Sequence, residues 1–282
     1  MSQQSVKASL TKPSLTPPLA LWKDLNLFET TPLLLMLDYD GTVVPIQDKP
    51  ELARPSSSLR STLKALSQQK NLIIAFVSGR DIADLKSLLS LEGIYYVGGH
   101  GAEMEDLLGN RYSLTSGASP AGWIDILHQE ACYCIGSHEG FLLERKKTSF
   151  ALHYRLASPS IVPVVLQSYR DKIQRLLEIE KLEMVEGKKV VEVRPARINK
   201  GSSVKRFLER YPEYHPLYLG DDRTDEDAFQ ALHGLGTTVL VSDIPKLTYA
   251  EYCLQSPQEV LQFLQILSMR CNDGSNQSPV ST

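Results

Sequence analysis

Two aspartates stand two residues apart directly after a short apolar run. Leu33 to Leu37 (LLLML) leads into Asp38-Tyr39-Asp40-Gly41-Thr42. A continuous apolar run of this length is typical of a strand buried on both faces, and the glycine permits a sharp turn after it. Two carboxylates at the edge of a sheet repel each other unless a cation or a proton intervenes. The pattern therefore predicts a site that binds a cation or transfers protons.

Further polar residues stand where other predicted strands end or where a predicted helix begins. They are Ser78 after an apolar run, Lys200 at a helix start, and Asp221, Asp222 and Asp225 after another apolar run. Clustered carboxylates suit Mg²⁺, and a lysine, a serine and a helix N-terminus can cradle an anion. Together with a carboxylate that can act as a covalent nucleophile, these groups predict phosphoryl transfer. Mg²⁺ and Lys200 would offset the repulsion between a phosphate monoester and the attacking aspartate.

The elements that must bring these residues together alternate between strand and helix. Strands are predicted at residues 33–37, 71–77, 94–97, 217–219 and 238–241, and helices at 56–69, 81–91, 201–210, 224–232 and 257–267. Such alternation predicts an α/β fold, a parallel sheet with helices on both faces. Ligands of such sheets bind at the carboxyl ends of the strands. We expect the polar residues to converge there although they are far apart in the sequence.

The alternation is interrupted between about residues 109 and 195. Strand-like segments at 141–146, 149–155 and 188–193 are separated by helical segments at 122–135 and 161–179. This change of pattern predicts a smaller α+β cap domain inserted into the core. The predicted organisation is a flexible arm (1–30), a first core part (31–108), the cap (109–195), a second core part (196–270) and a flexible tail (271–282).

Composition restricts the class of protein. The 282 residues carry a net charge of −3 and 42% of them are hydrophobic, which is enough apolar material for a sizeable core. The near-neutral balance argues against a nucleic-acid-binding protein, and the sequence has no apolar run long enough to predict a membrane span. The N-terminus lacks the apolar region of a secretory signal. We therefore expect a cytoplasmic monomer whose partner is a small molecule, and neither nucleic acid nor a membrane.

Four motifs resemble those of the haloacid-dehalogenase phosphohydrolase superfamily, and they occur in the same order. They are Asp38-x-Asp40-Gly41-Thr42, Ser78, Lys200, and Gly220-Asp221-Asp222-x-Thr224-Asp225. The resemblance implies a Rossmann-like core with a mobile α/β cap inserted between Ser78 and Lys200. It also implies a phosphatase reaction.

Longer segments resemble trehalose-6-phosphate phosphatases in particular. They are Leu37–Thr42, Val77–Arg80, Gly99–Glu103, Glu144-x-Lys146, Ala151–Arg155, Gly187–Pro195 and Gly220–Asp227. This narrower resemblance implies Mg²⁺-dependent hydrolysis of trehalose 6-phosphate to trehalose and phosphate, the final step of trehalose biosynthesis. The segments in the cap are the ones that point to this substrate.

The resemblance also implies a role for each motif residue. Asp38 would be the nucleophile that forms an aspartyl-phosphate. Asp40 would be the general acid that protonates the leaving sugar oxygen, and then the base that activates water. Ser78 and Lys200 would hold the phosphoryl oxygens. Mg²⁺ would be held by the carboxylates of Asp38 and Asp221 and the backbone carbonyl of Asp40, with Asp222 or Asp225 in support.

Charged residues of the cap and of neighbouring core loops are candidates for contacts with the sugar. Three resemble the disaccharide contacts of the family: Glu144, Lys146 and Glu192. Six others, for which a surface or cap–core salt bridge is an equal explanation, are Arg80, His100, Glu103, Arg155, Lys188 and Arg194. Thr42 of the first motif is a further substrate-binding candidate.

Alternatives of three kinds stay open. A phosphatase of the same fold would act on another glycosyl phosphate, such as sucrose phosphate or glucosylglycerol phosphate. A mutase would keep the phosphoryl group on its sugar. A regulatory or sugar-phosphate-binding module would have lost catalysis, yet Asp38, Asp40, Lys200 and Asp221 are all in place. Release of free phosphate from a panel of sugar phosphates separates these alternatives.

Overall fold

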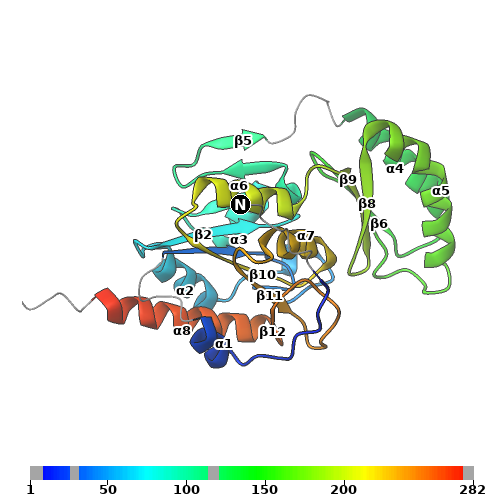
Figure 1. The fold of residues 1–282 in the computed structure, drawn as a ribbon. Helices are drawn as coiled ribbons and strands as arrows, with labels where there is room; N and C mark the ends of the chain where they lie inside the picture. The colour runs from blue at the N-terminus through cyan, green and yellow to red at the C-terminus, as the bar shows by residue number, and fades with distance from the viewer. Residues whose placement is uncertain (1–8, 26–31, 114–120, 276–282) are drawn as a thin grey trace, which may run out of the picture.

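The strands assemble into two sheets in the computed structural model, which describes residues 9–25, 32–113 and 121–275 (Figure 1). The larger sheet has eight strands in the order β12-β11-β10-β1-β2-β3-β4-β5. Their bounds are β1 (Leu33–Leu37), β2 (Leu72–Val77), β3 (Tyr95–Gly98), β4 (Glu103–Glu105), β5 (Arg111–Ser113), β10 (His215–Gly220), β11 (Thr237–Val241) and β12 (Tyr252–Leu254). The strands from β12 to β3 pair in parallel, and β4 and β5 add an antiparallel edge.

Helices cover both faces of this sheet, which is why its central strands are apolar along their whole length. Every residue of β1 and β2 is buried. One face packs against α1 (Pro18–Leu25), α2 (Ser57–Ser67), α3 (Ile82–Leu89) and α8 (Pro257–Ser275). The other face packs against α6 (Lys200–Arg210) and α7 (Arg223–Leu232). This arrangement confirms the α/β fold class that the alternating pattern predicts.

The smaller sheet lies within the segment that the sequence predicts to be an insertion. It is antiparallel, in the order β6-β7-β9-β8, with β6 (Leu142–Arg145), β7 (Phe150–His153), β8 (Leu182–Gly187) and β9 (Val190–Pro195). Helices α4 (Ala121–Ile135) and α5 (Val162–Glu180) cover one face, where Phe150 and Leu152 pack against Tyr169. Because side chains alternate between the faces of a strand, polar residues such as His153 and Glu192 are left on the opposite face.

The structure differs from the sequence prediction in several places, and strands β4 and β12 are among the elements that are not predicted. Residues 18–25 form helix α1 within the predicted flexible arm, because Leu21 is buried in the core against α8. Helix α8 continues to residue 275, into the predicted tail. Strand β5 falls in the predicted cap range but pairs with β4 in the larger sheet. Strand β8 is not predicted, since most of its residues are only half-buried and give no apolar run.

Among the described residues, no helix has both the length and the apolar character that a membrane crossing requires. Two short 3₁₀ turns contribute to the site described below. They are η1 (Pro50–Leu52), in the loop after β1, and η2 (Gly99–Gly101), directly after β3.

Candidate active site

The motif residues of the core converge at the carboxyl ends of three neighbouring strands. Strand β1 lies between β10 and β2 in the sheet. Asp38 follows β1, Ser78 follows β2, and Asp221 follows β10. All three residues are buried, at the edge where open α/β sheets bind their ligands.

Gly41 allows the turn after β1 to pass directly against Asp221. Its φ of +85° lies in the left-handed region that favours glycine. A Cβ at this position would lie 2.5 Å from Cγ of Asp221. The hydroxyl of Thr42, the next residue, lies 3.3 Å from Oδ1 of Asp221 and 3.5 Å from Oδ2 of Asp38. The turn therefore brings carboxylates from two separate strands to one hydroxyl.

Lys200 bridges two carboxylates from a buried position at the start of α6. Its ammonium lies 2.7 Å from Oδ1 of Asp38 and 2.7 Å from Oδ1 of Asp225, and only 2% of the side chain is exposed. Asn199 fixes this helix start, since its side chain accepts the N–H of Ser202. Burial alone would lower the pKa of Lys200, but the two carboxylates outweigh it and raise the pKa. The ammonium therefore stays charged.

Three buried carboxylates, Asp38, Asp221 and Asp225, have oxygens within 4.8 Å of one another and form a three-carboxylate cluster. Burial raises the pKa of Asp38 well above its usual value, with Lys200 opposing the shift. Burial also raises the pKa of Asp221 to about 6, and here Lys188 of the cap, which pairs with this carboxylate, opposes the shift. The ammonium groups of Lys188 and Lys200 thus face three carboxylates. Acidic groups outnumber basic ones in the cluster, which favours binding of a further cation.

Asp225 organises the loop after β10 and has its own oxygens occupied. Oδ1 accepts from Lys200 and from the Tyr218 hydroxyl, each at 2.7 Å. Oδ2 accepts the backbone N–H groups of Asp221 and Asp222, each at 3.0 Å. A carboxylate has about four lone-pair sites, so Asp225 has none left for an ion.

Asp38 and Asp221 are left as the carboxylates of the cluster that fit a hard cation such as Mg²⁺, which prefers oxygen ligands. Asp222, predicted as a further ligand, lies outside the three-carboxylate cluster. Its carboxylate accepts the N–H of Arg223 at 2.7 Å and caps helix α7. Asp222 thus caps a helix in the structure, and its part in supporting the ion stays a prediction.

Asp40 faces Arg80 rather than the three-carboxylate cluster. The Arg80 guanidinium donates from Nε to Oδ2 at 2.5 Å and from Nη2 to Oδ1 at 2.7 Å. It also donates to the Pro50 carbonyl at 2.8 Å and lies over the Tyr39 ring, 5.2 Å from its centroid. Arg80 therefore fixes the Asp40 side chain, and only the backbone carbonyl of Asp40 is left for the predicted ion.

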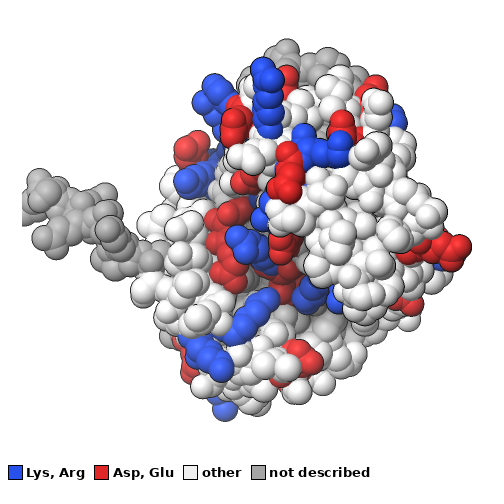
Figure 2. Space-filling view, turned by 90° about the vertical axis from the view of Figure 1, so that its right-hand side faces the viewer, with Lys and Arg blue, Asp and Glu red and all other residues white. Residues whose placement is uncertain are grey.

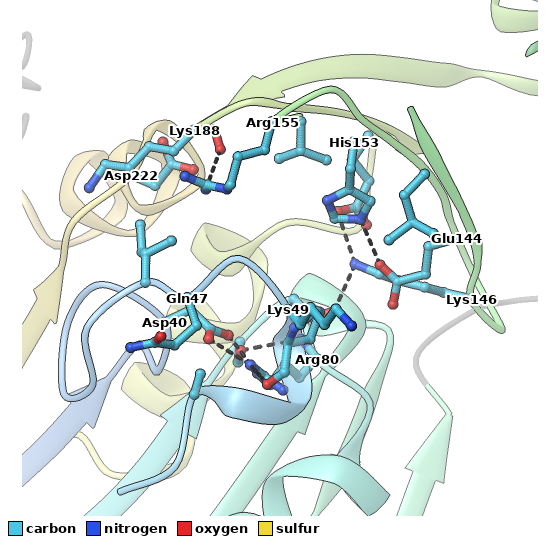
Figure 3. A pocket seen from close by; sticks show the side chains of 18 of the residues that line it. Asp40, Gln47, Lys49, Arg80, Glu144, Lys146, His153, Arg155, Lys188 and Asp222 are labelled. Atoms are coloured by element: carbon cyan, nitrogen blue, oxygen red, sulfur yellow. Dashed lines mark hydrogen bonds and ion pairs between the residues drawn. The ribbon is translucent and has the colours of Figure 1, made fainter. Parts of the chain in front are cut away.

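A cavity of about 520 Å³ lies between this edge of the core and the cap. Acidic and basic side chains gather around a hollow on this face of the molecule (Figure 2). The close view shows Asp40, Gln47, Lys49 and Arg80 of the core on one side of the cavity (Figure 3). Cap residues such as Glu144 and Lys188 lie on the other side, where Asp222 of the core lies beside Lys188. The volume is in the range of small-molecule sites.

The cap contributes two paired carboxylates to the cavity. Oε2 of Glu144 lies 2.9 Å from Nε2 of His153. Oε2 of Glu192 lies 3.2 Å from Nζ of Lys146 and 3.0 Å from Nε2 of His100 in the core. The His153 contact lowers the pKa of Glu144, and burial opposes it only in part. Charged groups that can accept or donate to hydroxyls therefore line the cap side.

Most of the predicted sugar-contacting residues line this cavity. They are Arg80, His100, Glu144, Lys146, Arg155, Lys188 and Glu192. Three others lie elsewhere. Thr42 is beneath the cavity against the carboxylates, and Glu103 pairs with Lys147 at 3.1 Å. Arg194 is buried and pairs with Asp227 of α7 at 3.0 Å, which joins the cap to the core.

Several residues that line the cavity were not predicted as site residues, among them Gln47, Lys49 and His153. His153 stands in the Ala151–Arg155 segment that carries the family resemblance, so a signal for it was present. Gln47 and Lys49 follow the first motif on an exposed loop, and only the path of that loop brings them to the cavity.

Comparison with known proteins agrees with this geometry. A trehalose-phosphatase family model matches residues 36–258. The chain is 35% identical to the probable trehalose-phosphate phosphatase H of Arabidopsis thaliana, over 86% of this chain and 74% of that protein. It is 33% identical to a trehalose-phosphate phosphatase of Mycobacterium marinum, over 81% of this chain and 60% of that protein, so it spans less than two thirds of the length of this relative.

Among solved structures, the C-terminal domain of the C. albicans trehalose-6-phosphate phosphatase superposes with a TM-score of 0.83 at 29% identity, covering 92% of this chain and 99% of that one. The motifs that meet at one sheet edge beneath the inserted cap lie within the matched span. The chain therefore belongs to the trehalose-phosphatase family, whose members are phosphoric monoester hydrolases.

Proposed function

We propose that the chain hydrolyses trehalose 6-phosphate to trehalose and phosphate with Mg²⁺ as its cofactor, the final step of trehalose biosynthesis. The observation that carries the proposal is the composition of the cavity walls. A buried carboxylate beside a charged lysine forms the core side, and paired carboxylates with their cationic partners form the cap side. The first wall suits a phosphoryl group, and the second suits a ligand with many hydroxyls. Membership of the family supports the same substrate.

Two displacements at phosphorus make up the proposed reaction. In the first, an oxygen of Asp38 attacks phosphorus, the bond from phosphorus to the sugar oxygen breaks, and that oxygen takes a proton from Asp40. In the second, a water gives a proton to Asp40 and its oxygen attacks phosphorus, which releases phosphate and restores Asp38. Because Asp40 must carry a proton in the first step, substrate binding has to loosen its ion pair with Arg80.

Positive charge around the phosphoryl group offsets the repulsion between a phosphate dianion and the Asp38 carboxylate. Lys200, already 2.7 Å from Asp38, and Ser78 would hold the phosphoryl oxygens. Mg²⁺, held by Asp38, Asp221 and the backbone carbonyl of Asp40, would supply further positive charge to those oxygens.

Phosphate release from a panel of sugar phosphates tests the proposal. The panel contains trehalose 6-phosphate, sucrose 6-phosphate, glucosylglycerol phosphate and glucose 6-phosphate, each with Mg²⁺ and with excess EDTA. We expect the highest kcat/KM for trehalose 6-phosphate and no turnover in EDTA, while Asp38→Asn stays folded and inactive. A preference for another glycosyl phosphate overturns the substrate, and full activity in EDTA overturns the cofactor.

Glu144→Gln tests the role of the cap wall. We expect it to lower kcat/KM for trehalose 6-phosphate about tenfold or more, since a hydrogen bond to a charged group is replaced by one to a neutral amide, and to leave hydrolysis of p-nitrophenyl phosphate nearly unchanged. Glu186→Gln is the matched control, because Glu186 also lies in the cap sheet but pairs with Arg170 on the exposed surface. Equal losses on both substrates remove the sugar-contacting role of Glu144.

A further inference from the structure

His100 occupies a strained backbone position in the turn η2. Its φ of +56° lies in the left-handed region, and both flanking glycines have positive φ as well. The turn is fixed against the end of β2, since the His100 N–H donates to the Ser78 carbonyl at 2.9 Å. Strain of this kind persists where the surroundings hold a residue in place, and it is concentrated at functional sites.

The turn directs the imidazole from the core into the cap. Only 7% of His100 is exposed, and its Nε2 lies 3.0 Å from Oε2 of Glu192 on β9. Gly79 makes room for the ring, because a Cβ there would lie 2.5 Å from Cε1 of His100. The glycine after Ser78 and the Gly99-His100-Gly101 turn therefore serve the same contact.

The imidazole is the donor in this contact. Burial alone would raise the pKa of Glu192, but the contacts with His100, Lys146 and the Ser149 hydroxyl outweigh it and hold the pKa well below its usual value, so the ionised carboxylate can only accept. Burial lowers the pKa of His100, and the nearby Glu192 opposes this only in part, which favours the neutral imidazole. Nε2 therefore carries the single ring N–H.

The two oxygens of Glu192 are used unequally. Oε2 is the acceptor for both His100 and Lys146. Oε1 is buried and accepts no hydrogen bond of ordinary length from the described residues, and the Ser149 hydroxyl, which also lacks such a partner, is near enough to help lower the pKa of Glu192. Glu192 nevertheless lines the cavity. A buried carboxylate oxygen without a partner is costly until a donor is supplied. A sugar hydroxyl in the cavity is such a donor.

We propose that His100 is a positioning residue, which holds Glu192 by one oxygen so that the other is presented to a hydroxyl of the sugar. The inference rests on the proposed function and replaces the expectation that His100 itself contacts the sugar. Because His100 belongs to the core and Glu192 to the cap, the contact exists only while the cap lies over the sheet edge. Recognition of the sugar by Glu192 therefore depends on the cap lying over the sheet edge.

Kinetics of single and double variants of the full chain test this role. His100→Asn removes the imidazole and keeps a residue that tolerates the left-handed region, and His100→Gln keeps an N–H donor near Glu192. Glu192→Gln is combined with His100→Asn in a double-mutant cycle, and His138→Asn at an exposed position is the control. Each protein is assayed on trehalose 6-phosphate and on p-nitrophenyl phosphate, and its thermal unfolding is recorded.

We expect His100→Asn to lower kcat/KM for trehalose 6-phosphate about tenfold, mainly through KM, with p-nitrophenyl phosphate within about twofold of the wild type. His100→Gln should recover part of the loss, and the double variant should lose no more than Glu192→Gln alone. Additive losses in the cycle, equal losses on the two substrates, or equal losses in His100→Asn and His100→Gln overturn the inference. A wild type inactive on trehalose 6-phosphate overturns the proposed function itself.

Discussion

Replacing Gly41 by alanine should disable the site while changing the stability of the fold only modestly. The φ of +85° costs a residue with a Cβ about 1–2 kcal/mol. The new Cβ would lie 2.5 Å from Cγ of Asp221 and closer still to its Oδ2, whereas ordinary contact begins at 3.4 Å, so the carboxylate must move by at least about 0.9 Å. The fold tolerates this because the carboxylate is the end of a side chain. A displacement of about 1 Å at reacting groups costs roughly 100-fold in rate.

Gly109→Ala is the matched control for this variant. Gly109 has a φ of +83°, and a Cβ there would meet nothing within 4 Å. Urea unfolding should show a loss of about 1–2 kcal/mol for both variants, whereas kcat for phosphate release should fall about 100-fold only in Gly41→Ala. If Gly41→Ala is as active as Gly109→Ala, the position of Asp221 does not matter for turnover. If it is far less stable, Asp221 does not absorb the clash.

Two further variants test the electrostatics. Lys200→Met leaves Asp38 and Asp225 buried without the ammonium that bridges them, so the free energy of unfolding in EDTA should fall by about 3–5 kcal/mol; a loss below about 1 kcal/mol in urea titrations would contradict the bridging role. Nε2 of His215 lies 3.0 Å from the Thr237 hydroxyl, and burial lowers the pKa of this histidine below its usual value of 6.5. His215 therefore binds a proton less readily in the folded state than in the unfolded chain. The free energy of unfolding declines as the pH falls through 6.5. His215→Gln should reduce this decline between about pH 7.5 and 5.5, and an unchanged decline would refute the assignment.

The elements that depend on local burial could be predicted from the sequence. Strands β1 and β2 are buried on both faces, so their apolar runs are visible in the sequence. Helix α2 shows Leu59, Leu63 and Leu66 at helical spacing, and all three are buried. Helix α1 and strand β8 could not be predicted, because their burial depends on distant partners. Leu21 is covered by the core and α8, and β8 pairs with β9 across only a half-buried surface.

The same distinction applies to the site. Asp38, Ser78, Lys200 and Asp221 could be placed together because each follows a predicted strand or begins a predicted helix. The choice between Asp222 and Asp225 depended on how helix α7 begins. The two residues form a capping box, in which Asp225 reaches back to the N-terminal N–H groups and so faces the cluster, while Asp222 caps the helix. That spacing was visible in the sequence, but its consequence for the cluster follows only from the fold.

Charged contacts that cross from the cap to the core make substrate binding and cap position interdependent. Lys188 of the cap pairs with Asp221, and Glu192 of the cap pairs with His100. Each contact takes charge out of water, so its net contribution is small unless further partners are present. A sugar phosphate bound as proposed would supply such partners on both sides, an anion near Lys188 and hydroxyls near Oε1 of Glu192. We therefore expect it to stabilise this arrangement over any in which the cap and the core are apart. A small phosphate ester, which reaches only one side, should stabilise it less.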